Sequence, residues 1–177
     1  MKKLTLPLSQ SDLENLHAKE MIYLSGDIYT ARDAAHKRLM QDIASNTVPF
    51  DLKGSVIYYV GPSPTPAHQI FGSAGPTTSS RMDKYTPTLL EHGVKILIGK
   101  GYRSKEVLES LKKHQAIYLL AVGGSAAILG NCVIASTPVA YEDLGAEAIL
   151  KLTVKDFPLF VGFDIYGVDA YVYGDLD

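Results

Sequence analysis

Three cationic side chains in this sequence, Arg32, Arg81 and Lys100, each stand beside a chain reversal. Each one follows an expected strand or lies at an expected helix start, which is where the ligand sites of α/β proteins gather. Guanidinium and ammonium groups in such positions bind carboxylates or phosphates through charge-assisted hydrogen bonds. If the fold brings the three side chains together, they suit a small dicarboxylate better than a single phosphate.

The segment GDIYTARDAAHKR predicts a helix that carries the first of these cations. Thr30 would open this helix, with Asp33 as its capping-box partner. Arg32 would fall in the first turn and His36 one turn later on the same polar face, opposite a stripe of alanine and leucine. A guanidinium beside the positive end of a helix suits a carboxylate. The alternative is a solvated helix face whose charged residues pair locally.

The segment GPTTSSRMD predicts a small anion site. A Gly-Pro turn is followed by four consecutive hydroxyl residues, among them Thr77 and Thr78, and Arg81 lies within the next helical turn. Hydroxyls, free N–H groups and an arginine at a helix start can together bind an anion. The alternative is that one hydroxyl caps the helix and the others only fill the loop.

Lys100 stands between two glycines at the end of the apolar run in ILIGKGYRS. Glycines allow close approach of the backbone, so a ligand site and an ordinary strand-to-helix turn remain equally open here. The glycine-rich AVGGSAA has neither a dinucleotide fingerprint nor a P-loop lysine, and a tight turn is the better interpretation. No G-x-S-x-G elbow is present, and the histidines lack metal-ligand spacing.

Composition excludes several classes of partner. The net charge of -2 argues against nucleic acid and anionic membranes, which usually need a basic excess. The one cysteine, Cys132, rules out an internal disulfide and a self-contained thiolate metal site, and its apolar context favours a packed strand cysteine. No apolar run approaches the roughly 20 residues that span a bilayer. The first apolar residues break at Pro7, so we expect a cytoplasmic protein.

Strands and helices alternate in the middle of the chain, and hairpin-like pairing dominates the end. We therefore predict an α/β fold with a mixed sheet and a second small sheet, in one domain over 1–177 with 1–20 as an N-terminal extension. That extension would hold a short helix with a Ser11–Glu14 capping box. The expected strands are 21–25, 55–60, 94–98, 116–122 and 131–136. The expected helices are 30–45, 104–114, 125–129 and 146–152, and one or two short helical turns, interrupted near Pro87, are expected in 79–93. A terminal hairpin would pair 157–163 with 169–173.

At this point the chain resembles a known family. GDIYTARDAAHKR, YYVGP, GPTTSSRMD, the GKG turn, YEDLGAEAI and DFPLFV occur in the order seen in the C-terminal domain of class I fumarases and in the β subunits of two-chain fumarases and L(+)-tartrate dehydratases. The resemblance runs from about Gly26 to the end of the chain. One departure is Ala146, where relatives often have proline; either residue suits a helix start.

The resemblance implies a shared active site. In this family a larger subunit or domain binds a cubane iron–sulfur cluster (4Fe-4S) through three cysteines, and an open iron acts as a Lewis acid on the substrate. The smaller domain, of swivelling β/β/α type, closes over the substrate. The single cysteine of this chain agrees with its being the smaller half, so the implied partner is a cluster-bearing α subunit, in a heteromer of two α and two β subunits.

The resemblance also assigns roles to residues. Arg32 and Arg81 would bind substrate carboxylates, and Thr77 would take part in proton transfer, although a threonine hydroxyl needs a neighbouring group to tune it. Lys100 would contact a carboxylate or orient Thr77. Thr78 and His36 complete the predicted substrate-binding set. Glu142 and Asp143 are possible acid–base residues, but support of the helix that follows them explains them equally well.

The sequence thus predicts a hydro-lyase subunit that hydrates and dehydrates a C4 dicarboxylate, fumarate/malate or L-tartrate/oxaloacetate. Two alternatives remain open. The chain could be a stand-alone carboxylate-binding or regulatory module without catalysis, or a subunit that serves chiefly as a scaffold.

Overall fold

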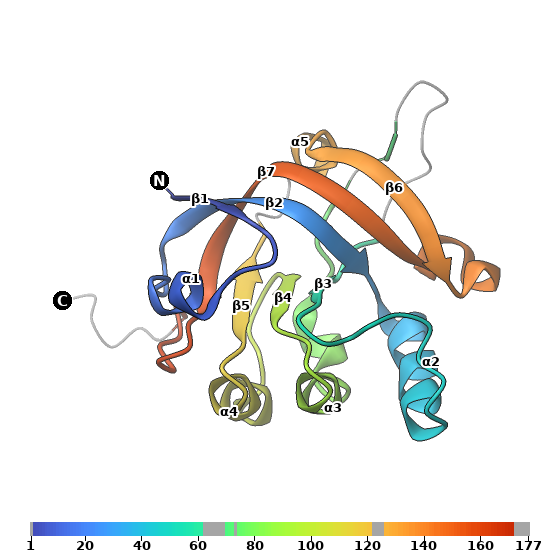
Figure 1. Cartoon of the computed structure of the whole chain (residues 1–177), viewed down its shortest axis with the longest axis horizontal. Coiled ribbons are helices and arrows are strands. Elements are labelled where there is room, and N and C mark those ends of the chain that lie inside the picture. The colour runs from blue at the N-terminus through green and yellow to red at the C-terminus, as the bar shows by residue number, and fades with distance from the viewer. Residues whose placement is uncertain (1, 62–69, 73, 122–125, 172–177) are drawn as a thin grey trace.

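The computed structural model describes residues 2–61, 70–72, 74–121 and 126–171 (Figure 1). Its strands belong to one seven-stranded sheet in the order β1-β2-β3-β4-β5-β7-β6, and β2 also pairs with β7. This extra pairing closes the five strands from β2 to β5 and β7 into a barrel. The strands are β1 Lys2–Thr5, β2 Met21–Thr30, β3 Val56–Tyr58, β4 Ile96–Gly99, β5 Ile117–Leu120, β6 Val133–Ala140 and β7 Ile149–Phe163.

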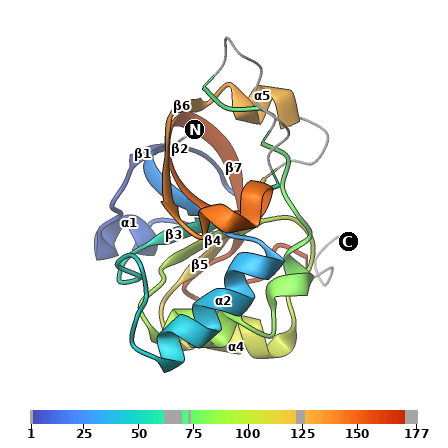
Figure 2. The ribbon, with the colours of Figure 1, turned by 90° about the vertical axis from the view of Figure 1, so that its right-hand side faces the viewer.

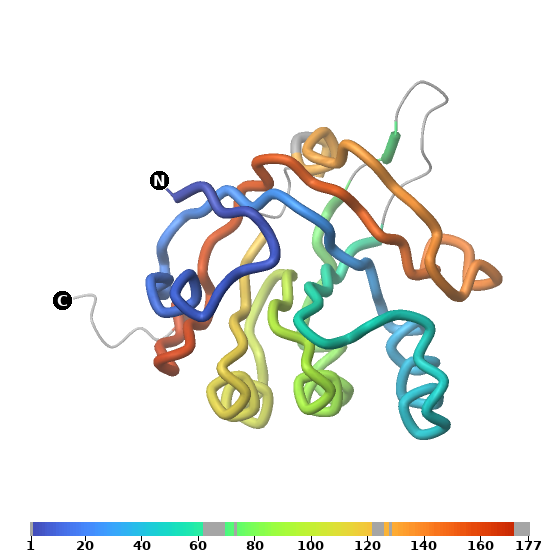
Figure 3. The backbone as a smooth tube through the Cα atoms, viewed as in Figure 1, coloured from blue at the N-terminus to red at the C-terminus, as the bar shows by residue number. Residues whose placement is uncertain are grey.

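The sheet is mixed, as the sequence predicted. Strands β1 to β5 pair in parallel, whereas β7 runs antiparallel to β2, β5 and β6. The expected second small sheet is not separate among the described residues, because β1 and β6 extend the same sheet at its two ends. Figure 3 traces how β2 and β7 arch over the parallel strands β3 to β5, with β6 beside β7.

The helices connect the parallel strands. Figures 1 and 2 show α2, α3 and α4 on one side of the parallel strands β3 to β5, with β6 and the part of β7 that pairs with it on the other. The helical segments are α1 Gln10–Glu14, α2 Asp33–Ala44, α3 Thr86–Glu91, α4 Lys105–Lys113 and α5 Ala126–Gly130, with the 3-10 segments η1 Ser79–Met82 and η2 Glu142–Glu147.

Two apolar clusters fill the molecule, one on each face of the parallel strands. Alternate residues of a strand point to opposite faces, so Tyr58 belongs to the cluster inside the barrel whereas Ile57 and Tyr59 belong to the cluster beneath the helices. Both faces of β3 and β4 are therefore buried, which explains their continuous apolar runs.

Two predicted helix starts were wrong by a few residues. The capping box of α1 consists of Ser9 and Asp12, not Ser11 and Glu14. Helix α2 begins at Asp33 with Arg32 as its N-cap residue, and Thr30 ends β2 instead. The Thr30 hydroxyl accepts a hydrogen bond from Leu150 N (3.0 Å), so this threonine joins β2 to β7 and does not cap the helix.

The predictions for the end of the chain were also wrong. The segment 146–152 is not a helix, because η2 ends at Glu147 and residues 149–163 form one long strand, β7. The segment 157–163 pairs mainly with β2 and β5. The expected hairpin is present only next to its turn, where Phe163 bridges Asp169 and Ala170 N donates to Gly162 O at 2.9 Å; residues 172 and 173 of it lie outside the described residues. The helical stretch in 79–93 is broken between η1 and α3, close to the predicted place, and Pro87 lies in the first turn of α3.

Candidate carboxylate-binding site

Three neighbouring parallel strands end at one edge of the barrel. Arg32 follows β2, Gly61 follows β3 and Lys100 follows β4. The ladder continues slightly past the strands, since Ala31 N donates to Tyr58 O at 3.1 Å. Because the carboxyl ends of parallel strands meet at the same edge, Arg32 and Lys100 come from the same end of the barrel, where ligands of α/β sheets bind.

The hydroxyl-rich segment crosses this same edge. Thr77 N donates to Tyr59 O at 2.7 Å, Thr78 forms a parallel bridge with Lys100, and Ser79 N donates to Lys100 O at 2.9 Å. Gly99 makes the close approach possible, because a Cβ there would lie 2.0 Å from Ser79 Oγ. The structure therefore brings Thr77, Thr78 and Lys100 together, as predicted.

Arg32 lies between the end of β2 and the end of β3. A Cβ added to Gly61 would lie 2.3 Å from its Nη1, so the guanidinium lies directly against Gly61. Its Nε is buried and has no hydrogen-bond partner among the described residues. A buried donor without a partner is costly, so Arg32 has an unused hydrogen-bonding group at this edge.

Arg81 reaches the same place from η1. Its guanidinium makes two hydrogen bonds to the carboxylate of Asp33, the first residue of α2, one of them from Nε to Oδ1 at 3.2 Å. The hydrogen bonds from Arg81 lower the pKa of Asp33, and the pKa of Arg81 is raised in turn. Asp33 follows Arg32 directly, so the two arginines that are predicted to bind substrate carboxylates lie beside one another. We call Arg32, Thr77, Arg81 and Lys100 the site cluster.

His36 is not on an exposed polar face, so that expectation was wrong. Its side chain is fully buried, near the rings of Tyr59 (5.4 Å between centroids) and Tyr85 (5.7 Å). Its Nδ1 lies 2.7 Å from Arg32 O, which makes Nδ1–H the donor. Burial lowers the pKa of His36 to about 4. The neutral ring supports the backbone of Arg32, and direct contact with a substrate stays a prediction.

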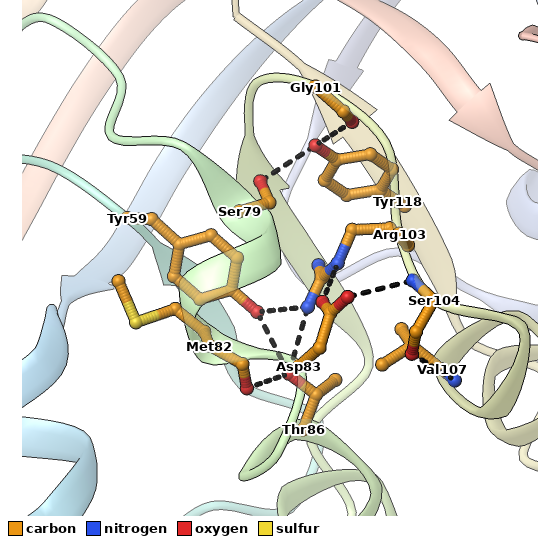
Figure 4. Close-up of polar contacts among 10 residues, drawn as sticks. All are labelled: Tyr59, Ser79, Met82, Asp83, Thr86, Gly101, Arg103, Ser104, Val107 and Tyr118. Carbon is orange, nitrogen blue, oxygen red and sulfur yellow. Dashed lines mark hydrogen bonds and ion pairs between the residues drawn. The ribbon is translucent and has the colours of Figure 1, made fainter.

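A second polar cluster, which the sequence did not reveal, surrounds Arg103 (Figure 4). Arg103 is buried and donates from Nε to Asp83 Oδ1 at 2.7 Å and from Nη2 to Thr86 Oγ1 at 2.8 Å and Tyr59 Oη at 3.1 Å. Its guanidinium also faces the rings of Tyr59 and Tyr118, at 5.2 and 4.9 Å. Burial opposes the charge, but these neighbours outweigh it and raise the pKa of Arg103.

The acidic residues after β6 have structural contacts. Asp143 accepts two hydrogen bonds from Arg38 of α2, at 2.7 and 2.9 Å. Glu147 Oε1 accepts from Ala34 N at 3.1 Å and so occupies a free N–H group of the first turn of α2. Asp143 therefore has a structural role, but it supports α2 and not a helix that follows it, as the structural alternative had supposed. Ala146 lies in η2 and contributes to no helix start.

The side chains that the structure describes do not form a metal-cluster site. Among the described residues no three histidine, cysteine, aspartate or glutamate side chains lie close enough to hold a metal ion. The single cysteine, Cys132, is half-buried just before β6, and burial raises the pKa of its thiol. An iron–sulfur cluster needs several thiolates, so the residues of this chain do not fit one. Across the described part of the chain, every helix is too short or too polar to cross a bilayer.

Comparisons with known proteins identify relatives of this chain. The family model for the fumarase C-terminus matches residues 2–174. The anaerobic class I fumarate hydratase of Escherichia coli is 41% identical over 97% of this chain, and fumarate hydratase 2 of Leishmania major is 42% identical over 85% of it. The chain spans only 31% and 27% of these two proteins.

A relative of similar length also exists. The putative L(+)-tartrate dehydratase subunit beta of Methanocaldococcus jannaschii is 37% identical over 93% of this chain and 88% of its own length. The family model matches nearly all residues, and together with these identities this match is sufficient to assign the chain to a family. The chain belongs to the fumarase C-terminus family.

Proposed function

We propose that this chain forms half of an active site that reversibly hydrates a C4 dicarboxylate, either fumarate to malate or the corresponding L-tartrate/oxaloacetate pair. The observation that carries the proposal is the gathering of the site cluster at one edge of the barrel. Relatives named fumarate hydratase and tartrate dehydratase subunit beta support the reaction class.

The two arginines would hold the substrate carboxylates. Each guanidinium can make two parallel hydrogen bonds to a carboxylate, which fixes orientation as well as position. Arg32 contributes a buried Nε that has no partner among the described residues. Arg81 is half exposed and bound to Asp33, so it can turn toward a ligand at little cost. Such fixed binding reduces the entropic part of the barrier.

Thr77 would act at the carbon that gains or loses a proton. Its backbone is fixed by the bond to Tyr59 O, so its side chain has a defined origin at the site edge. A hydroxyl alone is a poor base. The ammonium of Lys100, on the residue bridged to Thr78, would stabilise negative charge on the substrate or on Thr77. Thr78 and His36 would complete the substrate-binding residues. His36 would act indirectly, by holding the backbone of Arg32 in place.

We further propose that a cysteine-bearing α subunit carries a 4Fe-4S cluster and completes the site in a heteromer of two α and two β subunits in the cytoplasm. Two facts support a partner: the chain covers under a third of the curated fumarases, and one relative is named subunit beta. The whole chain would act as one domain within that complex.

The test is anaerobic co-expression with the cysteine-bearing α subunit and assay of fumarate, L-malate and L-tartrate. We expect the complex to turn over at least one of them and the isolated chain to turn over none. Full activity of the isolated chain would refute the shared site. A co-purified complex that binds malate without turnover would instead indicate a binding module.

Substitution of Arg81 separates a binding role from a scaffold role. Arg81→Ala should reduce kcat/KM by about 100-fold or more, because several kcal/mol of transition-state binding are lost. The matched control is Arg38→Ala, which removes an arginine that pairs with an aspartate across α2 but lies outside the site cluster. Equal activity of the two variants would favour the scaffold alternative.

A further inference from the structure

The buried guanidinium of Arg103 joins the two segments that carry the site cluster. Arg103 lies three residues after Lys100, whereas its partners Asp83 and Thr86 lie just after Arg81. The other oxygen of Asp83 accepts from Ser104 N at 2.7 Å. Arg103 and Asp83 thus connect the turn after β4 to η1 and α3 by several bonds (Figure 4).

A tyrosine reinforces the same connection. Tyr118 of β5 donates from its hydroxyl to Gly101 O at 2.9 Å, and the Ser79 hydroxyl lies 2.7 Å from the hydroxyl oxygen of Tyr118. The ring of Tyr118 also faces the guanidinium of Arg103. Gly101 follows Lys100 and Ser79 follows Thr78, so this network lies directly behind the residues that form the site.

An arginine is a costly way to obtain stability in this place. The side chain of Arg103 is 1% exposed, and its Nη1 has no hydrogen-bond partner among the described residues. Buried ion pairs often add little or no stability over apolar packing of similar volume, but they do fix the geometry of the groups that they join. Lysine cannot replace Arg103 here, because the bonds need a planar guanidinium and the two tyrosine rings face that plane.

We infer that Arg103 is a positioning residue, which fixes Lys100 and the segment Thr77–Arg81 relative to one another without contacting the substrate. The inference rests on the proposed function. A displacement of about 1 Å at a site can reduce the rate about 100-fold. Loss of the Arg103 fork should therefore reduce kcat/KM by about 10- to 100-fold even in a protein that is fully folded.

The experiment compares variants in the complex with the α subunit. Arg103→Met removes the fork, and the double variant Arg103→Met/Asp83→Asn also removes the carboxylate that would otherwise be left unpaired, in case the single variant does not fold. Arg103→Lys keeps the charge without the fork. The control is Leu111→Ala, a fully buried position of α4 outside the network that loses stability by cavity formation.

We expect Leu111→Ala to lower the thermal midpoint while kcat and KM, measured well below that midpoint, remain those of the wild type. The double variant should show the 10- to 100-fold loss in kcat/KM, and Arg103→Lys should not restore it. Wild-type kcat and KM in the folded double variant, or in Arg103→Lys, would overturn the inference.

A second readout does not depend on the reaction. Hydrogen exchange of the isolated chain reports the Ser79 amide, which is bonded to Lys100 O, and the Ile117 amide, which is bonded to Lys95 O at the other end of β4. The double variant should accelerate exchange at Ser79 at least about 10-fold more than at Ile117. Equal effects at both amides would overturn the inference, whereas an inactive wild-type complex with selective exchange at Ser79 would refute only the proposed reaction.

Discussion

Arg81 binds the carboxylate of Asp33 through Nε and Nη2, so one of the two predicted substrate ligands already holds an anion from its own chain. Both side chains are more than 40% exposed, at 49% and 42%. An ion pair of this kind contributes little to stability. Its importance lies in competition, because a substrate carboxylate and Asp33 would approach the same guanidinium.

Replacing Asp33 with asparagine should strengthen substrate binding. The variant removes one negative charge near the bound dicarboxylate but keeps an oxygen that can accept from Arg81. A unit charge several ångströms away in a water-like medium contributes somewhat under 1 kcal/mol, so the dissociation constant for L-malate should fall about threefold. Calorimetric titration of the complex at low and high salt measures this; a weaker affinity would show that Asp33 serves mainly to orient Arg81.

Gly61→Ala should displace Arg32 without unfolding the protein. The new Cβ would lie 2.3 Å from Nη1 and 2.9 Å from Cζ, both at the far end of a flexible side chain that can move away. We expect KM to rise about 10-fold, with a nearly unchanged thermal midpoint. The control is Arg32→Ala alone and combined with Gly61→Ala. If Gly61→Ala acts through Arg32, adding it to Arg32→Ala should cause no further loss.

Thr77→Val tests the hydroxyl separately from the backbone. Valine keeps the branched shape and the N–H that donates to Tyr59 O, so the segment should stay in place. If the hydroxyl takes part in proton transfer, kcat should fall by about 100-fold or more, with little change in KM. Thr77→Ser should retain most activity. Near-normal kcat in Thr77→Val would assign the proton transfer to another group.

Acid should destabilise the fold through His36. The pKa of an ordinary histidine is 6.5, and burial lowers that of His36 to about 4. The unfolded chain therefore takes up a proton on His36 that the folded chain does not. The stability of the fold that depends on a neutral His36 is complete above pH 6.5 and is lost as the pH falls from 6.5 toward 4. The loss amounts to roughly 3 kcal/mol.

Urea unfolding at pH 7 and pH 5 measures this effect. His36→Gln should show a smaller difference between the two pH values than the wild type, even if it is less stable at both. The groups around the ring are Tyr59, Tyr85, Asp33 and Arg103, and the nearby Arg103 charge also disfavours the protonated ring. The same pH dependence in His36→Gln would assign the effect to other groups.

The sequence was a good guide to the site because strand ends and turns have local signals. Lys100 between two glycines and the hydroxyl run before Arg81 both stand where the chain must reverse, and parallel strands bring such places together. Their assigned roles, by contrast, stay predictions. His36 was placed wrongly on a polar face because helical spacing puts it one turn after Arg32. The same spacing also puts it beside Ala35 and Leu39, and all three are buried in α2.

Arg103 could not be found in the same way. In the polar run GYRSKE it resembles a solvated residue, and its burial depends on Asp83, Tyr59 and Tyr118, which are distant in the sequence. The one local signal was Ser104, which caps α4 and ties that helix start to Asp83. The first part of β7 was taken for a helix for a related reason: short apolar runs do not distinguish a buried helix from a strand, and only the pairing with β2 and β6 decides between them.

The pairing of β2 with β7 limits how this protein can move. β2 lies between β3 and β7, and Arg32 follows its last residue with a single residue between them. The anchor of Arg32 therefore cannot shift by itself, since any displacement would break ladders on both sides of its strand. If the domain closes on the proposed α subunit, the barrel should therefore move as one rigid body.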